Sequence, residues 1–141
     1  MNKKLTAILS FFLLYSCFLY SSSFLLSRSA IAAEQILDAE AVTQLFSGNT
    51  YEANLPGRGL TMTVYADPDG TMKGMQNGKK FITHWKVNEQ GEICVSYRDK
   101  TNCRPIVEEN GLYKKYKLDE YGNKTILVVY EKFTPGNIHG F

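Results

Sequence analysis

Residues 93–106 read ICVSYRDKTNCRPI, and this stretch decides the fold. If the chain turns at Arg98-Asp99, residues whose numbers sum to 197 face each other on the two arms of a hairpin. Cys94 and Cys103 meet that condition. Directly opposed residues on antiparallel strands have Cα atoms about 4.5–5.5 Å apart, a separation that a disulfide bridges. The sequence therefore predicts an antiparallel hairpin held by a Cys94–Cys103 disulfide. A redox-active or metal-binding pair is the alternative, but it lacks the usual C-x-x-C spacing.

Short apolar runs separated by turn residues continue on both sides of this hairpin. Dipeptides such as Asn77-Gly78 and Asn110-Gly111 supply the positive φ angles of tight turns, and such short links join antiparallel neighbours. We expect eight strands, at residues 50–55, 60–66, 71–76, 80–87, 92–97, 101–107, 112–118 and 125–133. Since closure removes the exposed edges of a meander, the predicted fold is all-β, an eight-stranded antiparallel up-and-down barrel.

Alternation along the strands predicts which side chains point into the barrel. The inward set is Leu60, Met62, Val64, Phe81, Trp85, Val87, Ile93, Val95, Tyr97, Leu112, Tyr116 and Leu118. The last strand, residues 125–133, is apolar on both faces and therefore needs a cover on its outer side.

One helix is predicted, from Leu37 to Phe46. Asp38 suits the N-cap, and Leu37, Ala41 and Leu45 form one apolar stripe. We expect this stripe to pack on the outer face of the last strand.

The N-terminal residues predict export. Lys3 and Lys4 precede an uncharged run, residues 5–27, and an A-x-A site ends at Ala32, as in a signal peptide. An uncleaved membrane anchor and lipidation at Cys17 stay open as alternatives. All three place the domain outside the cytoplasm, periplasmic or secreted. The expected organisation is a signal peptide at 1–32, a linker and short helix at 33–48, a barrel at 49–134 and a tail at 135–141.

Charge argues against nucleic acid as a partner. Cleavage after Ala32 would remove Lys3, Lys4 and Arg28, which leaves 13 basic and 14 acidic residues in the mature chain. A formal charge of −1 with scattered basic residues does not suit a polyanion.

Six short segments of the chain resemble one bacterial family. They are Leu45-Phe46-Ser47-Gly48-Asn49-Thr50, Asp69-Gly70-Thr71-Met72-Lys73-Gly74, Trp85-Lys86-Val87, Gly91-Glu92-Ile93-Cys94, Cys103 and Gly136-Asn137. Together they resemble domain-of-unknown-function family 995, which comprises short exported proteins of lipocalin-like appearance. The resemblance covers nearly all of the mature chain and implies a shared lipocalin-like scaffold, without an activity.

Aromatic and basic residues suggest a binding site inside the barrel. Trp85, Tyr97 and Tyr116 would line a small cavity, and alternation brings Arg104 and Lys114 beside them. Because a buried cation needs an anionic partner, the expected ligand is small and amphipathic or anionic.

No residue pattern predicts catalysis. His84 and His139 are expected in solvent, and the acidic residues of the turns, such as Asp67 and Asp69, are expected to cap or solvate. The sequence contains no G-x-S-x-G, H-E-x-x-H or G-x-x-x-x-G-K-[ST] motif, so we expect neither a cofactor nor a metal.

Three hypotheses follow for function. The first is a non-catalytic envelope protein that binds a small amphipathic ligand in the barrel or a protein on its rim. The second is a protein-interaction or inhibitor module with a solid core, acting through exposed tyrosines and turn loops. The third is an enzyme with an unrecognised site.

Overall fold

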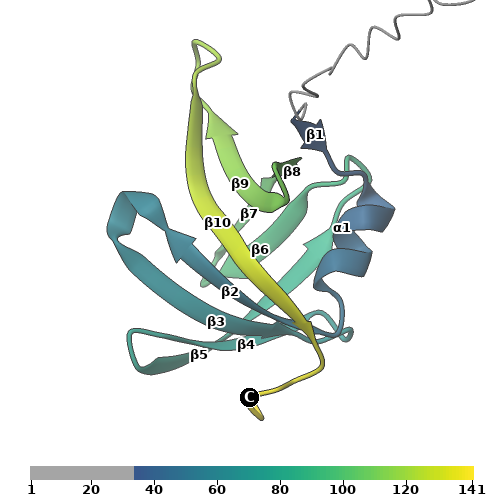
Figure 1. Cartoon of the computed structure of the whole chain (residues 1–141), viewed down its shortest axis with the longest axis vertical. Coiled ribbons are helices and arrows are strands. Elements are labelled where there is room, and N and C mark those ends of the chain that lie inside the picture. The colour runs from purple at the N-terminus through teal and green to yellow at the C-terminus, as the bar shows by residue number, and fades with distance from the viewer. Residues whose placement is uncertain (1–33) are drawn as a thin grey trace, which may run out of the picture. The chain divides into compact units, whose positions relative to one another are not determined.

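The computed structural model describes residues 34–141. The predicted leader and its cleavage site, in residues 1–32, lie outside the described residues. In the part described, strands dominate and one α-helix precedes most of them (Figure 1). The elements are β1 (Gln35–Ile36), α1 (Ala39–Phe46), β2 (Asn49–Leu55), a 3-10 turn (Pro56–Arg58), β3 (Leu60–Ala66), β4 (Thr71–Gln76), β5 (Lys79–Val87), β6 (Ile93–Tyr97), β7 (Lys100–Arg104), β8 (Ile106–Glu109), β9 (Leu112–Leu118) and β10 (Lys124–Pro135).

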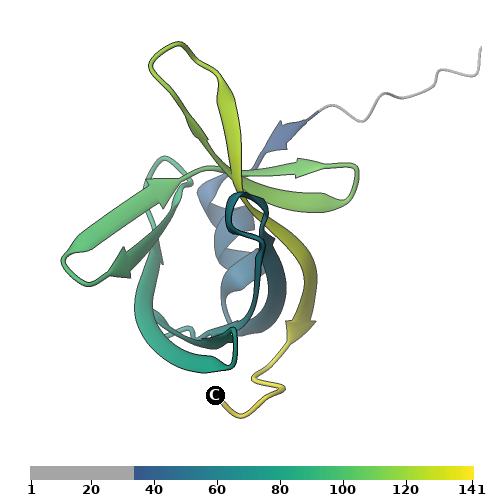
Figure 2. The same cartoon turned by 90° about the vertical axis from the view of Figure 1, so that its left-hand side faces the viewer.

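The strands form one antiparallel sheet in the order β1-β8-β9-β10-β2-β3-β4-β5-β6-β7. The sheet curls into a half-barrel, which Figure 2 shows end-on. The prediction of an all-β, barrel-like fold with a single short helix is confirmed for the residues described.

The strand number differs from the eight predicted. Each predicted segment is a strand, but Pro105 divides the segment 101–107 into β7 and β8, and the two-residue β1 is added. Proline has no backbone N–H to give to a ladder, so the strand breaks there. On one side of the break β7 pairs with β6, and on the other β8 pairs with β9.

The predicted central hairpin is confirmed. Cys94 stands opposite Cys103 in the β6–β7 ladder, and their sulfur atoms are bonded. The register that the cysteine spacing predicts is therefore the register of the β6–β7 ladder.

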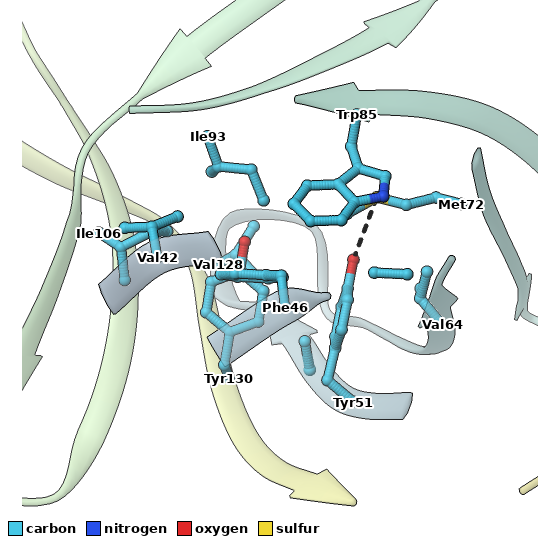
Figure 3. Close-up of a cluster of buried hydrophobic side chains, with 12 residues drawn as sticks. Val42, Phe46, Tyr51, Val64, Met72, Trp85, Ile93, Ile106, Val128 and Tyr130 are labelled. Atoms are coloured by element: carbon cyan, nitrogen blue, oxygen red, sulfur yellow. Dashed lines mark hydrogen bonds between the residues drawn. The ribbon is translucent and has the colours of Figure 1, made fainter. Parts of the chain in front are cut away.

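A cluster of aromatic side chains fills the curl around Phe46 (Figure 3). The Phe46 ring meets Tyr51, Tyr130 and Phe133 edge-on, with centroids 5.1 to 5.4 Å apart, and lies 6.3 Å from the centroid of Trp85. Edge-to-face contacts at these distances suit the quadrupoles of the rings. The aromatic core is therefore anchored by a residue of the helix.

The helix contacts the last strand as predicted, because Phe46 packs on Tyr130 and Phe133, but it does not cover the outer face of that strand. Asp38 caps α1 as expected, because its carboxylate accepts a hydrogen bond from the Ala41 N–H at 2.8 Å. The helix lies at one end of the curled sheet, at the right in Figure 1 and on the far side in Figure 2, and its side chains Val42 and Phe46 enter the core. Its most deeply buried side chains are Val42 and Phe46, one position away from the predicted stripe. The strand β10 contributes Val128 and Tyr130 to the core, and Leu127 and Phe133 pack against it. Its pairing is irregular between Ile126 and Val128 and again between Tyr130 and Lys132.

Among residues 34–141, no helix is long and apolar enough to cross a bilayer.

Candidate functional site

Trp85 is a core residue that ties β5 to the turn between β3 and β4. Its indole Nε1 donates a hydrogen bond to the Asp67 carbonyl oxygen at 3.0 Å, and its backbone N–H donates to the Gly70 carbonyl oxygen at 2.8 Å. Its polar atom is satisfied and its ring packs against Phe46, and the residue also borders the open groove described below.

Tyr97 does not lie in the interior as predicted. It ends β6 at the tip of the β6–β7 hairpin, and 64% of the residue is exposed. The Arg98 guanidinium carbon lies 5.5 Å from the centroid of the Tyr97 ring. The reason is that this hairpin extends beyond the core, so alternation no longer decides burial at its tip (Figure 2).

Lys114 and Tyr116 share the face of β9 that is turned away from the core around Phe46, although Tyr116 is buried as predicted, with 7% of the residue exposed. Lys114 forms an ion pair with Glu109, and Tyr116 packs under Lys124, whose Nζ is 4.4 Å from the ring centroid. The apolar residues Leu112 and Leu118, also predicted inward, are 40% and 57% exposed. The hydrophobic pattern of β9 therefore indicates the wrong face.

The inward face of β9 carries Tyr113 and Lys115 instead. Tyr113 meets the ring of Phe133 edge-on, with centroids 5.7 Å apart. Lys115 stands opposite Ile106 of β8 and Val128 of β10, both of which are buried in the core. Directly opposed residues share a face of the sheet, so Lys115 points inward.

Arg104 points inward as predicted, because it stands opposite the buried Ile93. Its Nη1 donates a hydrogen bond to the Cys103 carbonyl oxygen at 2.6 Å, while its Nε is buried and has no partner among the residues described. Burial, and secondarily the charge of Arg104, lower the pKa of Lys115 from 10.5 to about 8. The structure thus brings together two cations, Arg104 and Lys115, where the sequence predicted Arg104 and Lys114.

An open groove with a volume of about 380 Å³ lies between α1, the β3–β4 turn and β5. Several of its polar groups are already used locally: the Thr43 hydroxyl donates to the Ala39 carbonyl oxygen, and the Asp69 carboxylate accepts from the Thr71 N–H at 2.7 Å. The hydrogen bonds from Thr71 lower the pKa of Asp69. The groove is lined by Thr43, Ser47, Pro68, Asp69, Gly70, Trp85, Lys86 and Val87.

The turn acids cap their own turns, as predicted. The Asp119 carboxylate accepts hydrogen bonds from the Tyr121 and Asn123 backbone N–H groups, and the bonds from Asn123 are the main cause of its lowered pKa. Across residues 34–141, no three His, Cys, Asp or Glu side chains gather in a group that could hold a metal ion.

Sequence reasoning missed two functional candidates. Lys115 was not identified from the sequence, because the leucines of its strand lie on the other face and indicated that face as the inward one. Arg98 has a left-handed backbone, with φ of 53°. The two other non-glycine residues with positive φ, Asn77 and Asn110, precede glycines in standard tight turns, whereas Arg98 precedes Asp99. The sequence signal for Arg98 was that its predicted two-residue turn, Arg98-Asp99, contains neither Asn nor Gly.

No protein-family model matches this chain, and no curated protein matches it. The resemblance to domain-of-unknown-function family 995 therefore stays a prediction.

Proposed function

We propose that this protein is a non-catalytic binding module that engages a partner protein through the tip of its β6–β7 hairpin. The observation that carries the proposal is the covalently braced, projecting hairpin with an exposed Tyr97 and Arg98 at its tip. Tyrosine and arginine are the residue types that most often dominate binding energy in protein interfaces.

The hairpin is built to hold its tip in one shape. The Cys94–Cys103 disulfide crosses its base, and the Ser96 and Thr101 hydroxyls form a hydrogen bond of 2.8 Å nearer the tip. Such bracing orders the hairpin before the partner binds, so less conformational entropy is lost on binding. Residues in strained backbone conformations cluster at functional sites, and the left-handed Arg98 fits that tendency.

The tip carries Arg98 and Lys100 against the single acid Asp99, so we expect a concave partner surface with carboxylates beside an apolar wall. A membrane is a weaker fit, because a fluid anionic surface gains little from a rigid tip and only one aromatic side chain is offered to it.

The half-barrel acts as the scaffold of this hairpin, and the part of its interior around Phe46 is filled by side chains. The rings of Tyr51 and Tyr130 pack on Phe46 there. Pairing of the first long strand, β2, with the last, β10, supports a lipocalin-like up-and-down barrel that is interrupted at Pro105.

We further propose that the domain works outside the cytoplasm, in the periplasm or as a secreted protein. The Cys94–Cys103 disulfide supports this location, since such bonds persist in oxidising compartments. The charged and then uncharged residues at the N-terminus support it as well.

Photo-crosslinking in intact producing cells tests the interface. A photoreactive phenylalanine at position 97 should give one discrete adduct in the envelope fraction, mapped by mass spectrometry to an acidic surface of one protein. The matched control is position 121, because Tyr121 is 82% exposed on the β9–β10 turn and should give no such adduct.

Charge reversal completes the test. Arg98→Glu should weaken binding of the purified partner by about tenfold or more, as loss of an interface anchor does. Lys79→Glu, which reverses an exposed charge on β5, should leave the affinity unchanged. Equal adducts from positions 97 and 121, or capture of anionic lipid vesicles instead of a protein, would overturn the proposal.

A further inference from the structure

Two basic side chains share the inner face of the curl beside the Pro105 break, one from each side of it. Arg104 ends β7 opposite Ile93, and Lys115 lies in β9 opposite Ile106. Ile93 and Ile106 are fully buried, so both cations lie beside apolar side chains. Like charges in such surroundings repel each other strongly, because little water screens them.

Neither cation has an ion-pair partner among residues 34–141. The ion pairs of the described residues hold Lys73, Lys114, Lys124 and Lys132. The nearest acid on the same face of β8 by alternation is Glu108, and its carboxylate already accepts a hydrogen bond from the Gly111 N–H at 3.0 Å. Burial is the main cause of the lowered pKa of Lys115, and the charge of Arg104 adds to it.

Arg104 also keeps an unused donor. One nitrogen of its guanidinium is engaged by the Cys103 carbonyl oxygen, whereas Nε is buried without an acceptor. A buried donor without an acceptor is costly, and the guanidinium edge that carries Nε matches two oxygens of a carboxylate or a phosphate.

We propose that Arg104 and Lys115 form a binding site for the carboxylate or phosphate group of a small anionic ligand. An oxyanion at this place accepts from the free edge of Arg104 and from the ammonium of Lys115. It offsets the repulsion between the two cations and supplies the acceptor that Nε lacks. The site is separate from the proposed protein interface at Tyr97 and Arg98, and either can fail without the other.

The neighbouring residue provides a matched control. Lys114 differs from Lys115 by one position, but it lies on the opposite face of β9 and is paired with Glu109. A general effect of positive charge would treat the two lysines alike, whereas a site on the inner face depends on Lys115 alone.

The test titrates the full-length protein with inorganic phosphate and, separately, with acetate. Calorimetry gives the affinity, and NMR of isotopically labelled lysine side chains follows each ammonium group. At least one anion should bind and shift the Lys115 signal while the Lys114 signal stays still. Arg104→Gln and Lys115→Gln should each weaken binding by about tenfold or more, the usual effect of losing a charged hydrogen bond. Lys114→Gln should stay within about twofold, since it removes a charge outside the site.

The wild-type NMR titration decides the matter even if a variant folds poorly, because it reports on Lys115 directly. Phosphate or acetate binding should also raise the pKa of Lys115, as a nearby anion favours the protonated amine. Three results overturn the proposal: neither anion binds, Lys114→Gln weakens binding as much as Lys115→Gln, or the Lys115 signal does not respond.

Discussion

At the scale of single residues, two threonines show how burial changes the value of a hydroxyl. The Thr50 Oγ1 donates a hydrogen bond to the Gly136 carbonyl oxygen at 2.6 Å and accepts one from the Ile138 N–H at 3.4 Å. The Thr83 Oγ1 is buried on the inner side of β5 and has no partner among the residues described. The first hydroxyl therefore ties the C-terminal segment to β2, whereas the second only carries a desolvation cost.

We predict that Thr83→Val raises the free energy of unfolding by about 1 kcal/mol, because valine keeps the shape and removes the unsatisfied group. Thr50→Val is the matched control and should lower it by about 1–2 kcal/mol, since it leaves the Ile138 N–H without its acceptor. Urea unfolding followed by tryptophan fluorescence measures both. A loss of stability in Thr83→Val comparable to that in Thr50→Val would mean that the Thr83 hydroxyl has a partner.

At the scale of elements, the sequence correctly predicted the features that depend on neighbouring residues in the chain. The cysteine spacing and the two-residue turn determine the β6–β7 register, and the Asp38 cap determines where α1 begins. The facing of β9 was mispredicted because its two leucines lie at opposite ends of the strand, beside turns, where they are exposed. The docking of α1 was mispredicted because β10 was expected to need an outer cover, whereas its adjacent residues Leu127 and Val128 both pack on the core.

The disulfide should stabilise its hairpin more than the fold as a whole. It joins residues only nine positions apart, so its loss should lower the free energy of unfolding by at most about 3 kcal/mol. The double variant Cys94→Ala/Cys103→Ala should keep the native fluorescence of Trp85 and become more sensitive to proteolysis between residues 97 and 100. Wild-type protein treated with dithiothreitol is the control and should behave in the same way. Complete unfolding of both samples would contradict this expectation.

At the scale of the whole molecule, stability should depend on pH through Lys115. Its pKa is about 8 in the folded protein and 10.5 for an ordinary lysine. Between these values the unfolded chain binds more protons than the folded one, so the free energy of unfolding rises with pH. Below about pH 8 both states are protonated, and the full cost of the buried charge is present.

We compare the free energy of unfolding of the wild type with that of Lys115→Met, in a buffer without phosphate or carboxylate. Near pH 7 the variant should be more stable by about 1–2 kcal/mol, because an unpaired charge no longer has to be buried. The gap should narrow toward about pH 9.5 as the amine loses its proton. Burial raises the pKa of Tyr51 and Tyr130, which lowers stability at still higher pH, but this effect is common to both proteins and cancels in the difference. Chemical denaturation at several pH values measures the gap, and a constant gap would refute the assignment.

The place of Phe46 in the chain has a consequence for biosynthesis. Phe46 leaves the ribosome early, yet the rings of Tyr130 and Phe133 that enclose it are made among the last residues of the chain. Until β10 has been made, two of the rings that cover Phe46 are absent, so the aromatic core is incomplete. Completion of this core therefore requires β10, which follows the other strands of the sheet in chain order.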